Sequence, residues 1–217
     1  QQVQLERQTD KLDQHRRQAV SVLTDPNVRA AFDVERSAPE DAERYGRNKF
    51  GLSLLMGRRL IEAGVRLVQV NMGKNSSWDT HRRNFANLKD NLLPPLDKGM
   101  SALLDDMEAS GLLEDTLVRW GGEFGRTPFA QGKDGRDHNP NGFSIWLAGG
   151  GVKPGMSYGA TDDFCYNVFA NPVHVHDLNA PILHCLGIDH TRLTYRHQGR
   201  DFRLTDLHRK VIHDLLA

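Results

Sequence analysis

The chain has 217 residues with 28 basic and 28 acidic side chains, so its formal net charge at pH 7 is zero. This balance argues against a nucleic-acid-binding protein held by backbone electrostatics, because such proteins carry excess positive charge. Hydrophobic residues make up 38% of the sequence and no apolar run approaches the roughly 20 residues of a membrane helix, so we expect a polar globular protein without a membrane span.

The N-terminal part of the chain predicts helices. Apolar residues recur at helical spacing among many charges over residues 2–23, which is typical of an amphipathic helix. Asp25 and Pro26 indicate the start of a short second helix, with Asp25 as its N-cap. A third helix is expected over residues 39–63, and Gly64 would end it in the C′ position.

Helices and strands alternate further along the chain. Strands are expected over residues 65–71, 116–120 and 143–147 because these runs are apolar and partly β-branched. The long helix between the first two would run from about residue 84 to 110, with a break or kink at Pro94-Pro95. This alternation is typical of a parallel sheet covered by helices.

We expect one domain over residues 1–217, with a helical region at 1–63 and a sheet and metal-site region at 64–217. In the last part of the chain we expect a tight turn at Gly149–Gly151, a helix over 177–186 capped by Asp177, irregular structure over 191–203 and a final helix over 205–216. Cys165 and Cys185 either pair or stay free, and two cysteines are too few for a disulfide framework.

Three loops at the ends of predicted strands hold the side chains of a metal site. They contain Asp79 and His81, then Glu123 and Arg126, then Asp137 and His138. Loops at the carboxyl ends of parallel strands meet at one edge of a sheet, so these groups should converge. Carboxylates and imidazoles together suit a divalent cation, and a guanidinium suits an oxyanion.

Each loop also has a structural interpretation. Asp79 could cap the following helix and leave His81 exposed, while Glu123 and Arg126 could form an ion pair. The glycines before Lys153 could cradle an anion, although a tight turn is the preferred reading. No nucleophile elbow, P-loop or paired CxxC motif is present in the sequence.

Several motifs together resemble a known family. They are Trp78-Asp79-Thr80-His81, the run from Gly122 to Pro128, Gly135-Arg136-Asp137-His138, the run from Ala148 to Val152, the run from Gly159 to Asp162, Asp177-Leu178 and Leu186-Gly187. In this combination the chain, from about Tyr45 onward, resembles domain-of-unknown-function family 1501. These are sulfatase-like bacterial proteins grouped with the alkaline phosphatase superfamily.

The resemblance implies an α/β fold with a mostly parallel sheet sandwiched by helices, of which this chain would be the C-terminal half. It implies one or two divalent metals, zinc or manganese with iron as a further option, held by Asp79, His81, Glu123, Asp137 and His138. The missing N-terminal half, or another chain, would supply the nucleophile. It also implies a small anionic ester as substrate and a periplasmic or exported protein.

Two functions are therefore expected as alternatives. The first is a metal-dependent hydrolase of phosphate or sulfate esters, or its metal-binding half, in which Arg126 stabilises the equatorial oxygens of the ester. The second is a non-catalytic binding or assembly subunit that keeps the same scaffold. The second is favoured by Phe124, which stands where the superfamily has a histidine, and by the lack of a convincing nucleophile.

Overall fold

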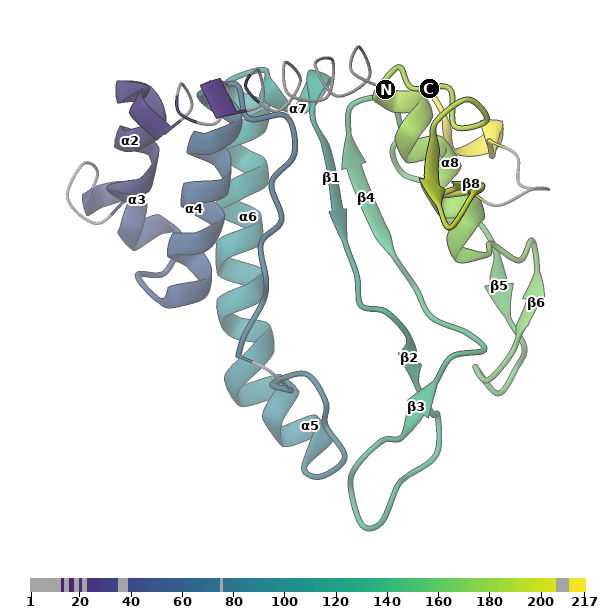
Figure 1. The fold of residues 1–217 in the computed structure, drawn as a ribbon. Coiled ribbons are helices and arrows are strands. Elements are labelled where there is room, and N and C mark those ends of the chain that lie inside the picture. The colour runs from purple at the N-terminus through teal and green to yellow at the C-terminus, as the bar shows by residue number, and fades with distance from the viewer. Residues whose placement is uncertain are drawn as a thin grey trace. The chain divides into compact units, whose positions relative to one another are not determined.

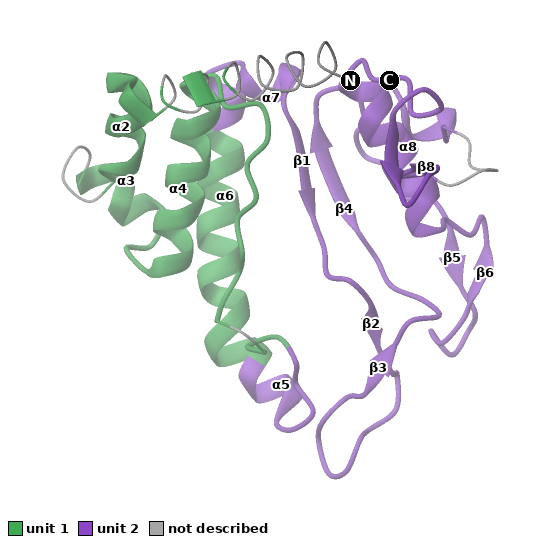
Figure 2. Cartoon of the chain, viewed as in Figure 1, with its two compact units in different colours: residues 1–78, 88–106 green, residues 79–87, 107–217 purple. Residues whose placement is uncertain are grey.

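The computed structural model describes residues 13, 16, 17, 20, 23–34, 39–74, 76–205 and 211–217 and has a mixed α/β content (Figure 1). Two compact units divide the chain: unit 1 comprises residues 1–78 and 88–106, and unit 2 comprises residues 79–87 and 107–217 (Figure 2). The amphipathic helix expected over residues 2–23 lies for the most part outside the described residues.

Unit 1 is helical in its described part. Its elements are α2 (Pro26–Phe32), α3 (Pro39–Arg44), α4 (Lys49–Glu62), the π-helical turn η1 (Leu88–Leu92) and α6 (Leu93–Ala109) as far as residue 106. Asp25 caps α2 as predicted, since its side chain accepts a hydrogen bond of 2.7 Å from the backbone nitrogen of Asn27.

The single helix expected over residues 39–63 is wrong, because α3 and α4 are separate. Gly46 and Arg47 adopt left-handed φ angles of 99° and 43°, which a right-handed helix cannot continue through. Asn48 then restarts the helix by accepting hydrogen bonds of 3.0 Å from the backbone nitrogens of Phe50 and Gly51.

Gly64 ends α4 as predicted, with a φ of 88° and the paired backbone hydrogen bonds of a Schellman motif. The strand expected over residues 65–71 is wrong, because this segment has no regular secondary structure and pairs with no described strand. Its residues Val68 and Val70 lie against Gly57 of α4. Leu67 is 84% exposed, so the apolar run covers the helix with one side only.

Helices α4 and α6 approach closely through two glycines. A Cβ on Gly99 of α6 would lie 2.9 Å from Leu54 Cδ1 and 3.6 Å from the Cα of Gly51. The backbones can therefore come together only because neither position carries a side chain. Around this contact the core of unit 1 consists of buried side chains: Val28, Ala31, Val34, Ala42, Tyr45, Leu54, Leu55, Ala102 and Leu103.

A buried ion network joins the helices of unit 1. The carboxylate of Asp106, 9% exposed, contacts the guanidiniums of Arg58 and Arg44, the latter at 2.6 Å. The hydroxyl of Tyr45 donates a third bond to it, at 2.9 Å. Burial raises the pKa of Tyr45, so its hydroxyl keeps the proton that it donates.

The kink predicted at Pro94-Pro95 takes a specific form. Helix α5 (Asn84–Asn87) continues through the π-helical turn η1 into α6, whose second and third residues are these two prolines. A proline nitrogen cannot donate to the carbonyl one turn earlier, and the wider turn relieves the resulting mismatch. Gly111, with a φ of 75°, ends the helical run as predicted.

Unit 2 contains all the described strands. Its elements after α6 are α7 (Leu112–Asp115), β1 (Leu117–Trp120), β2 (Gly125–Arg126), β3 (His138–Asn139), β4 (Trp146–Gly149), β5 (Ala160–Thr161), β6 (Val168–Ala170), α8 (Val175–Cys185), β7 (Thr194–His197), β8 (Arg200–Arg203) and the 3-10 helix η2 (His213–Leu215).

The parallel pairing expected of the strands is wrong for the described part of the chain, where all four strand pairs are antiparallel. They are β1 with β4, β2 with β3, β5 with β6, and β7 with β8. A parallel neighbour needs a crossover, usually a helix, whereas the chain between β1 and β4 contains none and folds back on itself. Residues 117–149 therefore fold back on themselves and form two successive two-stranded ribbons, β1 with β4 and β2 with β3, which Figure 1 shows.

The C-terminal part differs from the expectation at three places. His174, not Asp177, is the N-cap of α8, and Asp177 accepts a hydrogen bond from the backbone nitrogen of His174 in a capping box. Residues 191–203 are not irregular but form the β7–β8 hairpin. The helix expected over 205–216 falls partly outside the described residues, and residues 211–217 contain only η2.

The turn expected at Gly149–Gly151 is present. Gly149 and Gly151 have φ angles of 88° and 80° and form the tight turn after β4. Cys165 and Cys185 are free thiols. Within the described residues, no helix has the length and apolar character needed to cross a membrane.

A candidate metal centre

The β2–β3 ribbon of unit 2 presents two functional side chains opposite each other. In the pairing of β2 with β3, Arg126 lies directly opposite His138, so their side chains share one face. The pairing needs Gly125, because a Cβ there would lie 2.3 Å from the carbonyl oxygen of Gly142. Asn139, 1% exposed, anchors the second strand by donating a hydrogen bond of 2.9 Å to the carbonyl oxygen of Tyr166.

A second segment, residues 79–84, is held against the tip of this ribbon. The backbone nitrogen of Arg136 donates to the carbonyl oxygen of Thr80 at 3.1 Å, and the nitrogen of Asn84 donates to the carbonyl oxygen of Asp134 at 3.1 Å. Gly135 permits this approach, since a Cβ there would lie 1.9 Å from the carbonyl oxygen of His81.

Buried polar side chains, not an apolar core, hold the loops of this site. Thr80, Asn84 and Thr127 are each at most 6% exposed. The hydroxyl of Thr80 donates to Asn84 Oδ1, and the Thr127 hydroxyl accepts a bond of 3.1 Å from the backbone nitrogen of Asp137. Satisfied buried hydrogen bonds of this kind favour one loop conformation over others.

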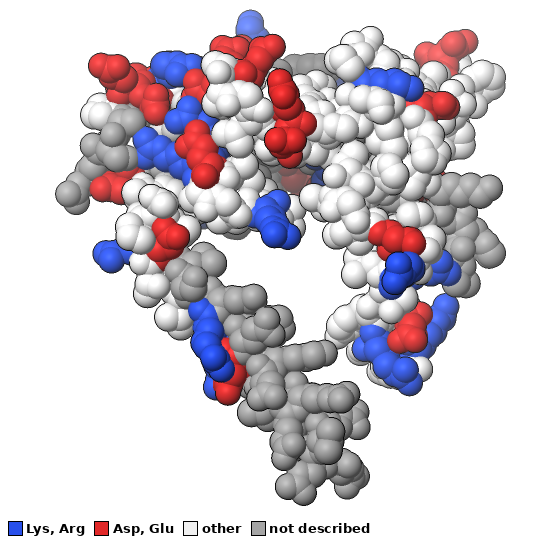
Figure 3. Space-filling model, turned by 90° about the horizontal axis from the view of Figure 1, so that it is seen from above, with Lys and Arg blue, Asp and Glu red and all other residues white. Residues whose placement is uncertain are grey.

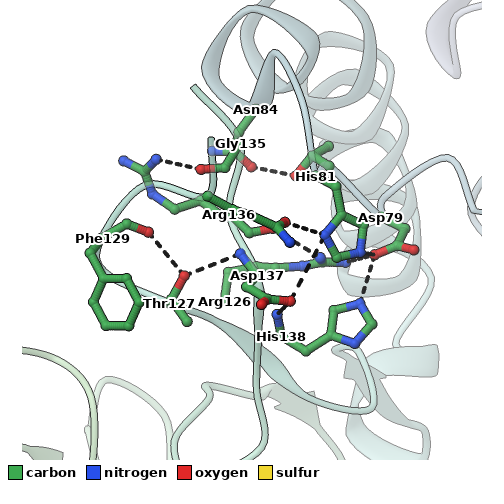
Figure 4. Close-up of polar contacts among 12 residues, drawn as sticks. Asp79, His81, Asn84, Arg126, Thr127, Phe129, Gly135, Arg136, Asp137 and His138 are labelled. Carbon is green, nitrogen blue, oxygen red and sulfur yellow. Dashed lines mark hydrogen bonds and ion pairs between the residues drawn. The ribbon is translucent and has the colours of Figure 1, made fainter. Parts of the chain in front are cut away.

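One carboxylate oxygen is the centre of the cluster. Asp79 Oδ1 lies 2.8 Å from His138 Nε2, 3.0 Å from His81 Nε2 and 2.7 Å from Arg126 Nη2 (Figure 4). The side chains of Asp79, His81 and His138 are 34%, 37% and 42% exposed, so solvent ions can reach them. On the face shown in Figure 3, acidic and basic side chains are interspersed, as the zero net charge suggests.

The donor atoms of Asp79, His81 and His138 fit a divalent cation. One ligand atom from each lies within 4.8 Å of the others. A cation with bonds of about 2.0–2.2 Å in a tetrahedral arrangement spaces its ligand atoms about 3.4 Å apart, so only small movements are needed. One carboxylate with two imidazoles, and room for further ligands, is a donor set known from catalytic metal sites.

The second nitrogen of His81 supports this reading. His81 Nδ1 is in contact with the side-chain amide of Gln131, and His81 Nε2 lies 3.0 Å from Asp79 Oδ1. Ligating histidines commonly have their other nitrogen held in this way.

Asp79 stays ionised over a wide pH range. The hydrogen bonds from His138 and Arg126 lower its pKa from 3.8 to about 2, with a smaller contribution from the charge of Arg126. Because a metal ligand must be deprotonated, the carboxylate is ready to bind a cation at any pH above this value.

The other residues predicted for the site lie at different places. Arg126 is in the cluster as the ion-pair partner of Asp79. Asp137 is at its rim, 3.9 Å from His81 Nδ1, with its carboxylate bonded to the backbone nitrogen of His138. Glu123 is exposed in the loop between β1 and β2 and is not among the three described residues that converge. Three of the five predicted metal ligands are thus brought together.

The sequence did not indicate the roles that three further residues have in the site. Gln131 orients His81, and Thr127 holds the backbone of Asp137. The ring centroids of Phe124 and His138 lie 4.2 Å apart, and the Arg126 guanidinium lies over the ring of Phe124. Phe124 is therefore a packing surface for both side chains. Only the glycines beside the motifs signalled such close approaches.

Comparison with protein families shows where the chain belongs. Residues 1–216 match the model of a family described as proteins of unknown function, DUF1501, and the chain is a member of that family. No curated protein and no solved structure matches the chain.

Proposed function

We propose that Asp79, His81 and His138 bind a divalent cation and that the chain is a metal-dependent hydrolase of phosphate or sulfate esters, or its metal-binding half. The observation that carries the proposal is the convergence of a carboxylate and two imidazole nitrogens within 4.8 Å at a solvent-accessible site. A bound cation would act there as a Lewis acid on an ester oxygen.

The protein side chains would bind and orient the ester. Arg126 has a planar guanidinium beside the cation site, and such a group binds the oxygens of phosphate or sulfate in pairs. Phe124 holds both Arg126 and His138 from one side, which limits their movement. Charge that develops on the ester oxygens would meet a preorganised cationic group.

The finer assignments belong to the same proposal. Nitrogen and oxygen donors together favour zinc or manganese over calcium or magnesium. Asp137 at the rim, and Glu123 if its loop moved, would be the residues to hold a second ion. Kinship with the alkaline phosphatase superfamily, and a nucleophile supplied by another polypeptide segment or chain, are supported by the order of the motifs along the sequence.

Metal binding is the first test. Titration of the chelator-treated chain with Zn²⁺ and with Mn²⁺ in a calorimeter should give one tight site. His138→Ala should weaken metal binding at least tenfold, because even residues that only orient a metal ligand change metal affinity by about 10- to 100-fold. His197→Ala, an exposed histidine on the β7–β8 hairpin, is the control and should bind as the wild type does. Equal binding by all three proteins would contradict the proposed site.

Hydrolysis is the second test, on the longest natural chain that contains these residues. Release of p-nitrophenolate from its phosphate and sulfate esters should depend on added metal and should fall in Arg126→Lys, which keeps the charge and loses the paired geometry. A metal site without any metal-dependent turnover would refute the hydrolase and leave the binding of the cation in place.

A second function is favoured by the contacts around one carboxylate oxygen. Asp79 Oδ1 already has Arg126, His81 and His138 around it, so the cluster could be a structural polar network in a non-catalytic binding or assembly subunit. In that case removing either histidine would lower thermal stability, and neither zinc nor manganese would raise it. Metal-dependent stabilisation of the wild type alone separates the two functions.

A further inference from the structure

A hollow of about 550 Å³ opens beside the metal cluster, entirely within unit 2. His81 belongs to both, because its ring lines the hollow and its Nε2 is directed at Asp79. The hollow has the size of ordinary small-ligand sites. The remaining lining residues are Arg82, Arg83, Gln131, Gly132, Lys133 and Asp134.

The charge of this hollow is positive. Arg82, Arg83 and Lys133 line it together with a single carboxylate, that of Asp134. The carboxylate of Asp134 has a structural role, since its Oδ1 accepts a hydrogen bond of 2.9 Å from the backbone nitrogen of Arg83. Among the described residues, no carboxylate lies within ion-pair distance of the three cationic side chains.

The walls of the hollow are held in place by the backbone. Lys133 is at the centre of a three-residue turn closed by the bridge between Gln131 and Gly135. On the other wall Arg83 adopts a left-handed φ of 51°, which is uncommon for a residue with a side chain. Asp134 stabilises that conformation through the hydrogen bond to the Arg83 nitrogen. Strained residues that the surroundings hold in this way are frequent at ligand sites.

We propose that this hollow binds a second anionic group of the substrate, a phosphate, sulfate or carboxylate carried by the part of the ester that leaves. The inference rests on the proposed function, because the cation held by Asp79, His81 and His138 would bind the ester group that reacts. It names the substrate class more narrowly, as small esters with at least two negative groups. Guanidiniums bind such oxyanions in pairs, and an ammonium adds a point charge.

Pyrophosphate is the probe, since its two linked phosphoryl groups offer the cationic side chains of the hollow more anionic oxygens than inorganic phosphate does. Its binding to the chelator-treated chain is measured by calorimetry at about 10 mM salt, where charge interactions extend about 30 Å, and again at about 150 mM, where they extend about 8 Å. We expect it to bind at least fivefold more tightly than inorganic phosphate and to weaken at the higher salt. Inorganic sulfate and acetate, titrated singly, identify which oxyanion the hollow prefers.

The double variant Arg82→Ala/Lys133→Ala should weaken pyrophosphate binding at least fivefold, because it removes two of the three cationic side chains that line the hollow. The matched control is Lys153→Ala/Arg196→Ala, which removes one lysine and one arginine of the same unit outside the hollow. It should bind pyrophosphate as the wild type does. All four side chains are exposed, and circular dichroism checks that both variants fold.

Equal binding of pyrophosphate by the two double variants would overturn the inference, and so would equal affinity of the wild type for pyrophosphate and phosphate. The metal is absent from these titrations, so the expected result does not depend on whether Zn²⁺ or Mn²⁺ binds. Conversely, the zinc titration of His138→Ala does not depend on Arg82 or Lys133. Failure of the hollow and failure of the metal centre are therefore distinguishable.

Discussion

Gly135→Ala should separate the two segments that form the candidate metal centre. The added Cβ would lie 1.9 Å from the His81 carbonyl oxygen and 2.3 Å from its carbon, whereas real Cβ atoms keep at least 3.0 Å from such atoms. Both obstructing atoms belong to the backbone, so no side chain can rotate away. The segment that carries Asp79 and His81 must therefore move by roughly an ångström from the ribbon.

The cost follows from the contacts that this movement stretches. Three hydrogen bonds donated by backbone nitrogens join the segments: Arg136 nitrogen to Thr80 oxygen, Asn84 nitrogen to Asp134 oxygen, and Arg83 nitrogen to Asp134 Oδ1. At about 0.5–1.5 kcal/mol each, their loss predicts a decrease of about 2–4 kcal/mol in the free energy of unfolding of unit 2. Overpacking penalties of about 1–3 kcal/mol lead to a similar value.

Two measurements check this prediction. Urea denaturation followed by tryptophan fluorescence measures stability, and zinc titration measures the metal centre. Gly132→Ala is the matched control in the same turn, because its φ of 60° makes alanine strained but a Cβ there meets no atom within 4 Å. It should cost about 1 kcal/mol and leave zinc affinity unchanged. If Gly135→Ala binds zinc as tightly as Gly132→Ala, the close approach does not position His81.

Three further variants test other parts of the structure. Asp106→Asn should destabilise unit 1 by about 1–3 kcal/mol, because it removes the least exposed carboxylate that Arg58 contacts and leaves that guanidinium with Asp41 and Glu62. The exposed neighbour Asp105→Asn is the control, and thermal unfolding within about 0.5 kcal/mol of it would contradict the network. Asn139→Ala should cost about 1–3 kcal/mol by orphaning two backbone groups, and calorimetric stability equal to the wild type would refute that role. The folded pKa of Asp79, about 2, is below its value of 3.8 in an unfolded chain, so its stabilising effect is present above about pH 4 and is lost as the pH falls towards 2. The melting temperatures of metal-free wild type and Asp79→Asn should therefore converge between pH 4 and 2, and a constant gap over that range would show that the carboxylate is not stabilised by its partners.

Local features were predictable because their causes lie within a few residues. The cap at Asp25, the helix end at Gly64 and the turn at Gly149–Gly151 each depend on one residue type at one backbone conformation. The N-cap of α8 was predicted at the wrong residue. His174 caps α8 instead of Asp177, because the acidic side chain acts from the third helical position.

The sequence also indicated which residues the three functional loops contain, but it did not indicate which of these loops lie close together. Asp79, His81 and His138 were named from residue type and position, and the structure brings them together. Glu123 was predicted as a metal ligand on the same grounds, and it does not lie with these three residues. Which loops meet depends on how strands pair, and the motifs carry no information on pairing.

What the sequence by itself determined is the cap of α2, the ends of helices at Gly64 and Gly111, and the family to which the chain belongs. What only the tertiary structure decided is the antiparallel ribbon that sets Arg126 opposite His138 and the contact of Gly135 with His81. The physical reason is range. Helix caps and turns are set by contacts within about four residues, whereas strand pairing joins segments whose apolar patterns fit parallel and antiparallel neighbours equally well.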